Sequence, residues 1–342
     1  MHFRIGCSSK KKHLFISSTT VSYPRDGLMH HWEMENAAAL SVALKEADFQ
    51  VSTLCCSRPS CFDFAARKNN TALLIKIHSD IDTFSHQDAT ELKIIADHVS
   101  ATSLIISQKT HDKPLADDTV YSRHAILVVT EKTIKNIALQ TANPIVYAGP
   151  GGYFVEINGA LVEKRRKELS LSIGKLADMI CVSRRTLYGY ERGMAKASVT
   201  SAYNLAQTLG IPVAKPINIL EKTRKQSYCL LTKATRAIAG QALLFKVFRK
   251  FALCNISPVH KAPFDFIMNI PNEKHAIIGS IATNKEKHLD KRVEETLSIC
   301  QVINAHPVLI TEKPRSFSED INCVCMDELH AMHTPKDLIA TA

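Results

Sequence analysis

The sequence of 342 residues lacks any long run of apolar residues. Its longest apolar stretches, such as residues 125–129, have the length of a β-strand. A helix that crosses a bilayer needs about 18 to 20 apolar residues. No apolar segment of signal-peptide length follows the lysines at positions 10–12. The sequence therefore predicts a cytoplasmic protein with no membrane partner.

Two further kinds of site are missing from the sequence. The ten cysteines include no C-x2-C pair, which excludes the common zinc-binding spacings. Glycines gather at Gly149, Gly151 and Gly152, but neither a dinucleotide fingerprint nor a G-x-x-x-x-G-K-[ST] signature is present. We therefore expect no metal and no cofactor, and we interpret these glycines as a loop at a domain boundary.

What the chain does have is length and positive charge. Its net charge is +10 and its pI is near 9.1, with 45% hydrophobic residues. The length exceeds one ordinary core and suits two or three domains. A basic balance favours a polyanionic partner, and nucleic acid before a membrane surface.

Two distant segments share one order of elements. Each has a helical stretch, a short strand, a Phe-Asp-Phe triplet, a second apolar strand, a helix with apolar 3–4 spacing and another strand. The triplets are residues 62–64 and 264–266. This correspondence predicts an internal duplication. The expected units are residues 1–32 as a partly disordered N-terminal extension, 33–148 and 221–342 as repeated α/β domains, and 149–220 as a central helical domain.

The central segment, residues 172–192, has the pattern of a helix-turn-helix. Ala177 supplies the small residue where two helices cross, and Cys181 takes the turn position that normally needs a left-handed glycine. That departure costs about 1 kcal/mol of backbone strain. Ser183 is the expected N-cap of the second helix. The apolar seam between the helices is predicted to consist of Leu176, Ala177, Ile180, Val182, Leu187 and Tyr190.

The second helix is predicted to start at Arg184 and to enter the major groove of double-stranded DNA. Arg184 and Arg185 can each bond guanine O6 and N7, and Thr186 can touch a thymine methyl or a phosphate. Ser172, which opens the first helix, suits a phosphate contact. The predicted DNA-binding residues are Lys164, Arg165, Ser172, Ser183, Arg184, Arg185, Thr186, Tyr188, Gly189 and Arg192.

Flanking helices over residues 161–169 and 198–209 are expected to complete a five-helix module. Residues 160–215 contain ten Lys and Arg against four Asp and Glu, so most of the net charge lies here. Such a concentration of positive charge supports DNA binding through counterion release.

The run LADMICVSRRTLYGYERG resembles the Cro/C1-type (XRE) family, whose pattern is roughly L-A-x-x-x-G-V-S-x-x-T-[IL]-x-x-[YW]-E-x-G. It departs at Cys181, and Ile173 stands where many members carry a phosphate-binding Gln. Over residues 35–342 the chain is similar, more specifically, to archaeal HTH-type transcriptional regulatory proteins. The similar segments are FDFAARKNNTALLIKI, YAGPGGYFVEINGALVEKRRKELSLSIGKLA, SRRTLYGYERG and VAKPINIL. This resemblance implies a transcription regulator.

The two α/β segments resemble the restriction-endonuclease-like PD-(D/E)xK fold. Active members of that fold hold a divalent metal with an Asp and an acid two residues before a Lys. Asp63 and Lys76 match, but Leu74 stands where the acid is required. The second segment keeps Asp265, with Gly279 and Ser280 where the Lys should be. Candidates for a substitute acid in the first segment are Glu33, Glu35 and Glu46.

We therefore predict a DNA-binding regulator that acts as a homodimer and is not an enzyme. In this interpretation Asp63 and Asp265 are strand-end acids satisfied by backbone N–H groups, and the α/β domains serve dimerisation, regulation or contact with the DNA backbone. Two alternatives stay open. One is a metal-dependent nuclease targeted by the helix-turn-helix, and the other is an architectural protein that binds DNA weakly and a protein partner strongly.

Overall fold

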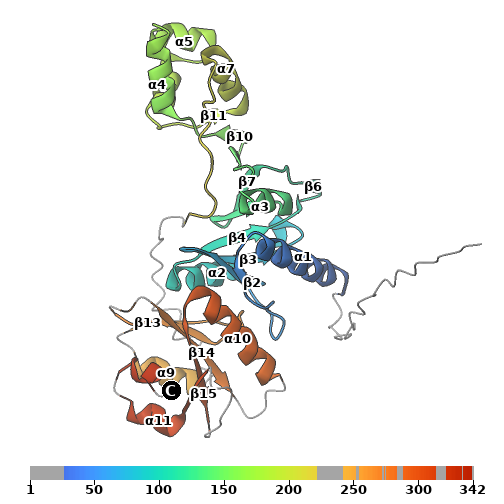
Figure 1. Cartoon of the computed structure of the whole chain (residues 1–342), viewed down its shortest axis with the longest axis vertical. Coiled ribbons are helices and arrows are strands. Elements are labelled where there is room, and N and C mark those ends of the chain that lie inside the picture. The colour runs from blue at the N-terminus through green and yellow to red at the C-terminus, as the bar shows by residue number, and fades with distance from the viewer. Residues whose placement is uncertain are drawn as a thin grey trace, which may run out of the picture.

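The computed structural model describes residues 27–221, 242–251, 254–271, 273, 275–282, 288–312, 321–332 and 334–340. An α/β domain, a smaller helical domain and a second α/β domain follow one another along the chain (Figure 1). The extension predicted over residues 1–32 falls largely outside this part of the chain, and the first helix already begins at Gly27. No helix within the described ranges is both long and apolar enough to cross a membrane.

The first α/β domain is built on a mixed sheet with the strand order β1-β2-β3-β4-β8-β7. Its first three strands run antiparallel, whereas β3, β4 and β8 run parallel. The strands are β1 (Gln50–Val51), β2 (Phe64–Lys68), β3 (Thr71–Ile77), β4 (Thr102–Ile106), β7 (Thr119–Arg123) and β8 (Ile126–Val129), with a small ribbon of β5 (Lys109–Thr110) and β6 (Lys113–Pro114). The helices are α1 (Gly27–Glu46), η1 (Ile81–Thr83), α2 (His86–His98) and α3 (Glu131–Ala138).

The second α/β domain has a five-stranded sheet of order β12-β13-β14-β15-β16. Two antiparallel pairings are followed by two parallel ones, which is the succession of β1-β2-β3-β4-β8. The strands are β12 (Asn255–Pro258), β13 (Phe266–Asn269), β14 (Ala276–Ala282), β15 (His306–Thr311) and β16 (Asn322–Cys325). The helices are α9 (Ala242–Lys250), α10 (Leu289–Ile303), α11 (Met326–Ala331) and α12 (Asp337–Ala340).

The two α/β domains share one hydrophobic core. Helix α2 packs against β13 of the second domain, and α10 packs against β2 of the first. The core between them takes buried side chains from both domains, and at its centre the rings of Phe62 and Phe264 lie 6.5 Å apart between centroids. Both rings are fully buried, which contributes about 1.5–3 kcal/mol each. The domains therefore pack as one body, with α2 and α10 between the sheets (Figure 1).

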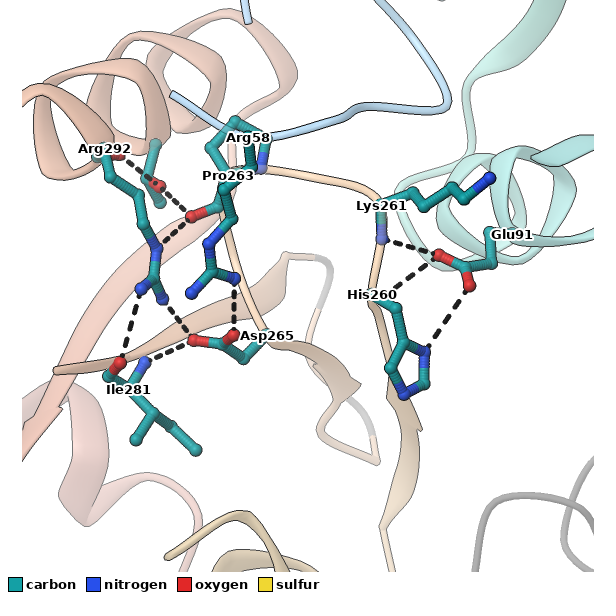
Figure 2. A network of polar contacts seen from close by, with 9 residues as sticks. Arg58, Glu91, His260, Lys261, Pro263, Asp265, Ile281 and Arg292 are labelled. Carbon is teal, nitrogen blue, oxygen red and sulfur yellow. Dashed lines mark hydrogen bonds and ion pairs between the residues drawn. The ribbon is translucent and has the colours of Figure 1, made fainter. Parts of the chain in front are cut away.

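Two buried glutamates cross this interface in opposite directions. Glu295 of α10 accepts hydrogen bonds from the backbone N–H groups of Cys56 and Ser57, both at 2.9 Å. Glu91 of α2 accepts from the backbone N–H groups of His260 and Lys261 at 3.1 and 2.9 Å (Figure 2). Each carboxylate thus holds the loop that leads into the Phe-Asp-Phe triplet of the other domain. Such a reciprocal exchange is what a two-fold interface produces, here within one chain.

The helix-turn-helix domain continues from the first sheet. Strand β9 pairs in parallel with β7, so the sheet extends through the hairpin of β9 and β10 to β11. The glycines expected to form a boundary loop make the turn of this hairpin, where Gly151 and Gly152 have φ values of 88° and 136°. The elements are β9 (Val146–Gly149), β10 (Gly152–Val155), α4 (Gly159–Glu168), α5 (Ile173–Met179), α6 (Arg184–Glu191), β11 (Ala197–Ser198) and α7 (Val199–Leu209).

The expected count of five helices is not reached in this domain. Residues 149–221 contain the four helices α4 to α7, including both predicted flanking helices. Helix α7 ends at Gly210 in the left-handed conformation, with a φ of 66°. Beyond it Pro212 and Pro216 lack the N–H groups that helix hydrogen bonds need, and the chain reaches residue 221 without another helix. Residues 222–241 lie outside the described residues.

The turn of the helix-turn-helix has the strained backbone that the sequence predicts. Cys181 has a φ of 56°, and its side chain is exposed. Cys181→Gly should therefore raise the free energy of unfolding of the domain by about 1 kcal/mol, because glycine carries no Cβ penalty there. Chemical denaturation followed by circular dichroism measures this change. Cys181→Ala keeps the Cβ and should bring no gain; equal gains from both substitutions would contradict the interpretation.

The glutamates between the α/β domains give a second expectation for stability. Glu295 is 2% exposed and accepts from two partly buried N–H groups, so Glu295→Ala leaves these groups without their acceptor and should cost about 2–3 kcal/mol. The neighbouring exposed residue offers a matched control, Glu294→Ala, which should change stability by less than about 0.5 kcal/mol. Equal denaturation midpoints for the two variants would show that the exchange across the interface adds nothing.

Candidate nucleic-acid interface

The two helices of the helix-turn-helix begin at serine caps. The Ser172 hydroxyl accepts a hydrogen bond from Lys175 N at 3.1 Å and starts α5. The Ser183 hydroxyl accepts from Thr186 N at 3.0 Å and starts α6, and it also lies 2.8 Å from the Thr186 hydroxyl. These contacts use the hydroxyl groups to fix the first turn of each helix. The first turn of a helix has further N–H groups without an intrahelical acceptor, which suits an acceptor such as a phosphate.

The predicted apolar seam joins the two helices on their inner side. Most of its members are at most 5% exposed, and Val182 is half-buried at the edge. Because this face is committed to the core, the opposite face of α6 carries the exposed side chains. Arg184, Arg185 and Tyr188 are exposed there, and Thr186 is half-buried beside its cap. The buried seam residues are Leu176, Ala177, Ile180, Leu187 and Tyr190.

Positive charge is placed at an end of α6 that does not favour it. The first turn of α6 contains Arg184 and Arg185 and no acidic residue. The N-terminus of a helix is the positive end of its dipole, so cations there reduce helix stability. Among the described residues, neither arginine nor the nearby Lys175 makes an ion pair within 4.0 Å. An approaching polyanion is therefore the partner that would compensate these charges.

The basic helix α4 presents less free charge than its sequence suggests. Arg165 Nη1 lies 3.0 Å from Glu168, and Lys167 Nζ lies 2.8 Å from Glu163. Arg165 also donates from Nε to the carbonyl of Leu209 at 3.1 Å, which ties α4 to the end of α7. Of the four consecutive basic residues, exposed Lys164 is the one with no acidic partner among the described residues.

A buried ion pair fixes α6 against α4, and the sequence did not indicate it. Arg166 Nε and Nη2 donate to the two carboxylate oxygens of Glu191 at 2.6 and 3.0 Å, and Nη1 donates to the carbonyl of Leu171 at 2.9 Å. Both side chains are at most 9% exposed. Arg166 looked like part of a basic surface, whereas its bidentate geometry makes it an internal clamp on the end of the recognition helix. The Tyr-Glu dipeptide that closes the family pattern was the available signal.

The later part of α6 offers a flatter surface. Arg192 lies over the ring of Tyr188 at 5.5 Å from its centroid, so the two exposed side chains form a cation–π pair. Gly189 has no side chain, and a Cβ there would sit 3.4 Å from the Cβ of Ala195. Both arginines of α6 lie in its first turn.

The orientation of this domain is fixed by two connections to the first sheet. Lys196 Nζ lies 3.5 Å from the centroid of the Tyr147 ring, which joins the loop after α6 to strand β9. The returning chain pairs Ala214 with Ile157 in an isolated bridge. Ile217 and Ile219 then insert into the core of the first α/β domain. The domain that contains α6 is thus connected to the first α/β domain both before and after its helices.

In the first domain, the lysine of the PD-(D/E)xK pattern binds the aspartate of that pattern. Lys76 Nζ lies 2.7 Å from Asp63 Oδ1, and Ile77 N donates to Oδ2 at 2.6 Å. Burial of the Lys76 ammonium by itself lowers its pKa, but the charge and hydrogen bond of Asp63 outweigh burial and raise it. Leu74, at the position of the missing acid, is fully buried. Asp63 is therefore satisfied by the protein, and these residues do not fit a divalent metal site.

Glu33 is the one candidate substitute acid that reaches this position. His78 Nδ1 lies 3.0 Å from its carboxylate, and Ser79 N donates to it at 3.2 Å. Burial alone raises the pKa of Glu33, but hydrogen bonding to His78 and the charges of His78 and Lys76 lower it overall. Glu35 is exposed and contacts His31, and Glu46 is exposed at the end of α1. The Glu33 carboxylate is thus engaged by the His78 side chain and by the backbone N–H of Ser79.

In the second domain, two arginines bind the corresponding aspartate. Asp265 accepts from Ile281 N at 2.6 Å and is bonded by Arg292, which is fully buried on α10 (Figure 2). Arg58 reaches over from the first domain and donates to Asp265 Oδ1 at 2.7 Å. Ser280 stands in β14 where the first domain has Lys76 in β3. Asp265 thus also has an interdomain role.

Comparison with known proteins gives matches to both kinds of domain. The pattern described as a PD-(D/E)XK superfamily domain matches residues 34–144, and the pattern described as a helix-turn-helix matches residues 162–215. Among solved structures, the regulator ClgR of Corynebacterium glutamicum is 22% identical and covers 27% of this chain and 82% of its own. Its TM-score of 0.15 is too low to carry an argument.

Relatives from archaea match along most of the chain, each under the name "Putative HTH-type transcriptional regulatory protein". One from Methanosarcina barkeri is 39% identical over 274 residues, covering 78% of this chain and 83% of the relative. Relatives from Methanococcus maripaludis and Methanocaldococcus jannaschii are each 29% identical and cover 82% of this chain, with 89% and 87% of their own lengths. The chain belongs to this family of HTH-type transcriptional regulatory proteins.

Proposed function

We propose that the protein is a sequence-specific DNA-binding transcription regulator whose α6 enters the major groove. The observation that carries the proposal is the pair of exposed arginines at the capped start of that helix, which make no ion pair with any described residue and whose charge an anionic partner would compensate. The names of the archaeal relatives support a regulatory role. The bases would be read by Arg184 and Arg185, while Lys164, Ser172 and Arg192 would contact the DNA backbone.

The α/β domains serve this function as a scaffold. We treat residues 33–148 and 221–342 as repeats of one nuclease-like unit on either side of the DNA-binding unit 149–220, with 1–32 as an extension. The identical succession of strand directions and the reciprocal roles of Glu91 and Glu295 support the duplication. Asp63, Lys76 and Asp265 form ion pairs within the protein, so we assign no catalysis to either unit.

The assembly expected from the sequence is a homodimer that reads two half-sites. One helix-turn-helix per chain supports this arrangement, since such motifs commonly bind two-fold DNA sites as dimers. The matching faces of the α/β domains already meet within the chain, so a dimer would use another surface. Access to chromosomal DNA is the basis for the expected cytoplasmic location.

Selection of bound sequences from a random pool of DNA duplexes tests the function directly. The full chain should enrich one motif and bind it with an affinity that falls steeply with salt. Arg184→Ala and Arg185→Ala should each weaken binding to that motif by about 5- to 150-fold, because each removes a bidentate contact to guanine.

A matched control comes from the second α/β domain. Arg249 is an exposed arginine on α9, and Arg249→Ala should leave the affinity for the motif unchanged. A pool that yields no enriched motif, or an equal loss from all three substitutions, would argue against sequence reading by α6.

The alternative function is a metal-dependent nuclease targeted by the helix-turn-helix. The match to a PD-(D/E)XK superfamily domain and the convergence of Glu33, Asp63 and Lys76 are the observations in its favour. The buried Leu74 and the ion pair that occupies Asp63 speak against it.

Incubation of the purified chain with selected DNA and Mg²⁺ or Mn²⁺ separates the two functions. We expect intact DNA, and the same result for Asp63→Asn, because Leu74 stands where the motif requires an acid and Lys76 already engages Asp63. Cleavage by the natural chain that disappears in Asp63→Asn would establish the nuclease instead. Cleavage that persists in Asp63→Asn would identify a contaminating enzyme.

A further inference from the structure

The glycine in the first turn of α5 lies directly under the side chain of Arg184. A Cβ built on Gly174 would stand 2.8 Å from Nε, 3.0 Å from Cζ and 3.1 Å from Nη2 of that arginine. These are three atoms of one guanidinium group, so the group lies against the glycine backbone. No side chain can occupy position 174 while Arg184 keeps this position.

The backbone itself gives no reason for a glycine at this position. Gly174 is the second residue of α5 and has no positive φ, whereas the strained position of the motif is Cys181. Glycine is less favourable than alanine within a helix. The space above Gly174 is therefore what the glycine provides, and the Arg184 guanidinium takes that space.

Arg184 gains orientation from this contact without losing its donors. It is the first residue of α6, it is exposed, and it makes no ion pair with a described residue. An arginine side chain in solvent samples many rotamers, and ordering them weakens binding. A guanidinium that rests on a helix backbone is partly ordered before the ligand arrives.

We propose that Gly174 is a positioning residue that presets Arg184 to read a guanine, so that the recognised DNA contains a guanine at the step facing the start of α6. This inference rests on the proposed function. Planar guanidinium donors match guanine O6 and N7 in a way that no other base pair offers. The Thr186 hydroxyl is engaged with Ser183, and Gly189 has no side chain, so the first-turn arginines carry most of the reading.

Gly174→Ala is the sharp test, because the atoms that it displaces are the far end of a flexible side chain. The variant should fold with an unchanged or higher denaturation midpoint, yet bind the selected motif about 10-fold more weakly. The double variant Gly174→Ala with Arg184→Ala should bind no more weakly than Arg184→Ala alone, because both changes act on one contact. If Gly174 had a purely structural role, Gly174→Ala would instead lower the denaturation midpoint, and its effect on DNA affinity would add to that of Arg184→Ala.

DNA that lacks the N7 acceptor gives an independent readout. A duplex with 7-deazaguanine at the guanine read by Arg184 should weaken binding of the natural chain about 10-fold and leave the Arg184→Ala variant unaffected. Natural affinity in Gly174→Ala, additive losses in the double variant, or indifference to 7-deazaguanine at every guanine of the motif would each overturn the positioning role while specific binding stands. Absence of any enriched motif would overturn the proposed function as well.

Discussion

The packing of two α/β domains against each other is the constraint on which the rest of the structure depends. Phe62 and Phe264 pack in the core that both domains build, and Glu91 and Glu295 accept hydrogen bonds from backbone groups of the opposite domain. Breaking the hydrogen bonds between a buried carboxylate and backbone N–H groups is costly, because both the charge and the N–H groups lose their partners. The interface therefore behaves like a domain core rather than like a transient contact.

The aspartates of the two Phe-Asp-Phe triplets are engaged beside this domain interface. Asp63 and Asp265 sit at the start of strands beside the shared core, and each is satisfied by backbone and by cations. In the second domain one of those cations, Arg58, comes from the first domain. The carboxylates that a nuclease would use on a metal are thus engaged within the protein, and Asp265 also links the two domains.

Local patterns made part of this structure predictable from sequence. The seam, the serine caps and the left-handed Cys181 depend on residues a few positions apart, and all are present. The matched order of elements around the Phe-Asp-Phe triplets predicts an internal duplication, and the like strand directions of the two sheets support it. The prediction of a fifth helix is wrong for residues 149–221, because Gly210 and Pro212 end the helical part of the domain.

Contacts between distant residues could not be predicted in this way. Arg58 and Asp265 are 207 positions apart, and no periodicity links them. Arg166 is one of four consecutive basic residues, which suggests surface charge, although its position four residues after the buried Val162 puts it on the inner face of α4. Gly279 looked like a lost catalytic position, whereas the Phe266 ring lies so close that a Cβ would be 1.9 Å from it. Gly174 gave a weak signal, a glycine inside a helix, whose meaning needed the position of Arg184.

The proposed function places DNA on one face of the helix-turn-helix domain and gives the paired α/β domains the role of a scaffold. Hydrogen–deuterium exchange of the full chain, with and without the selected duplex, tests it at the level of single segments. We predict that DNA slows hydrogen exchange in residues 172–192 and leaves the exchange rates of the strands around Asp63 and Asp265 unchanged. Protection centred on those strands, with α6 unaffected, would contradict it.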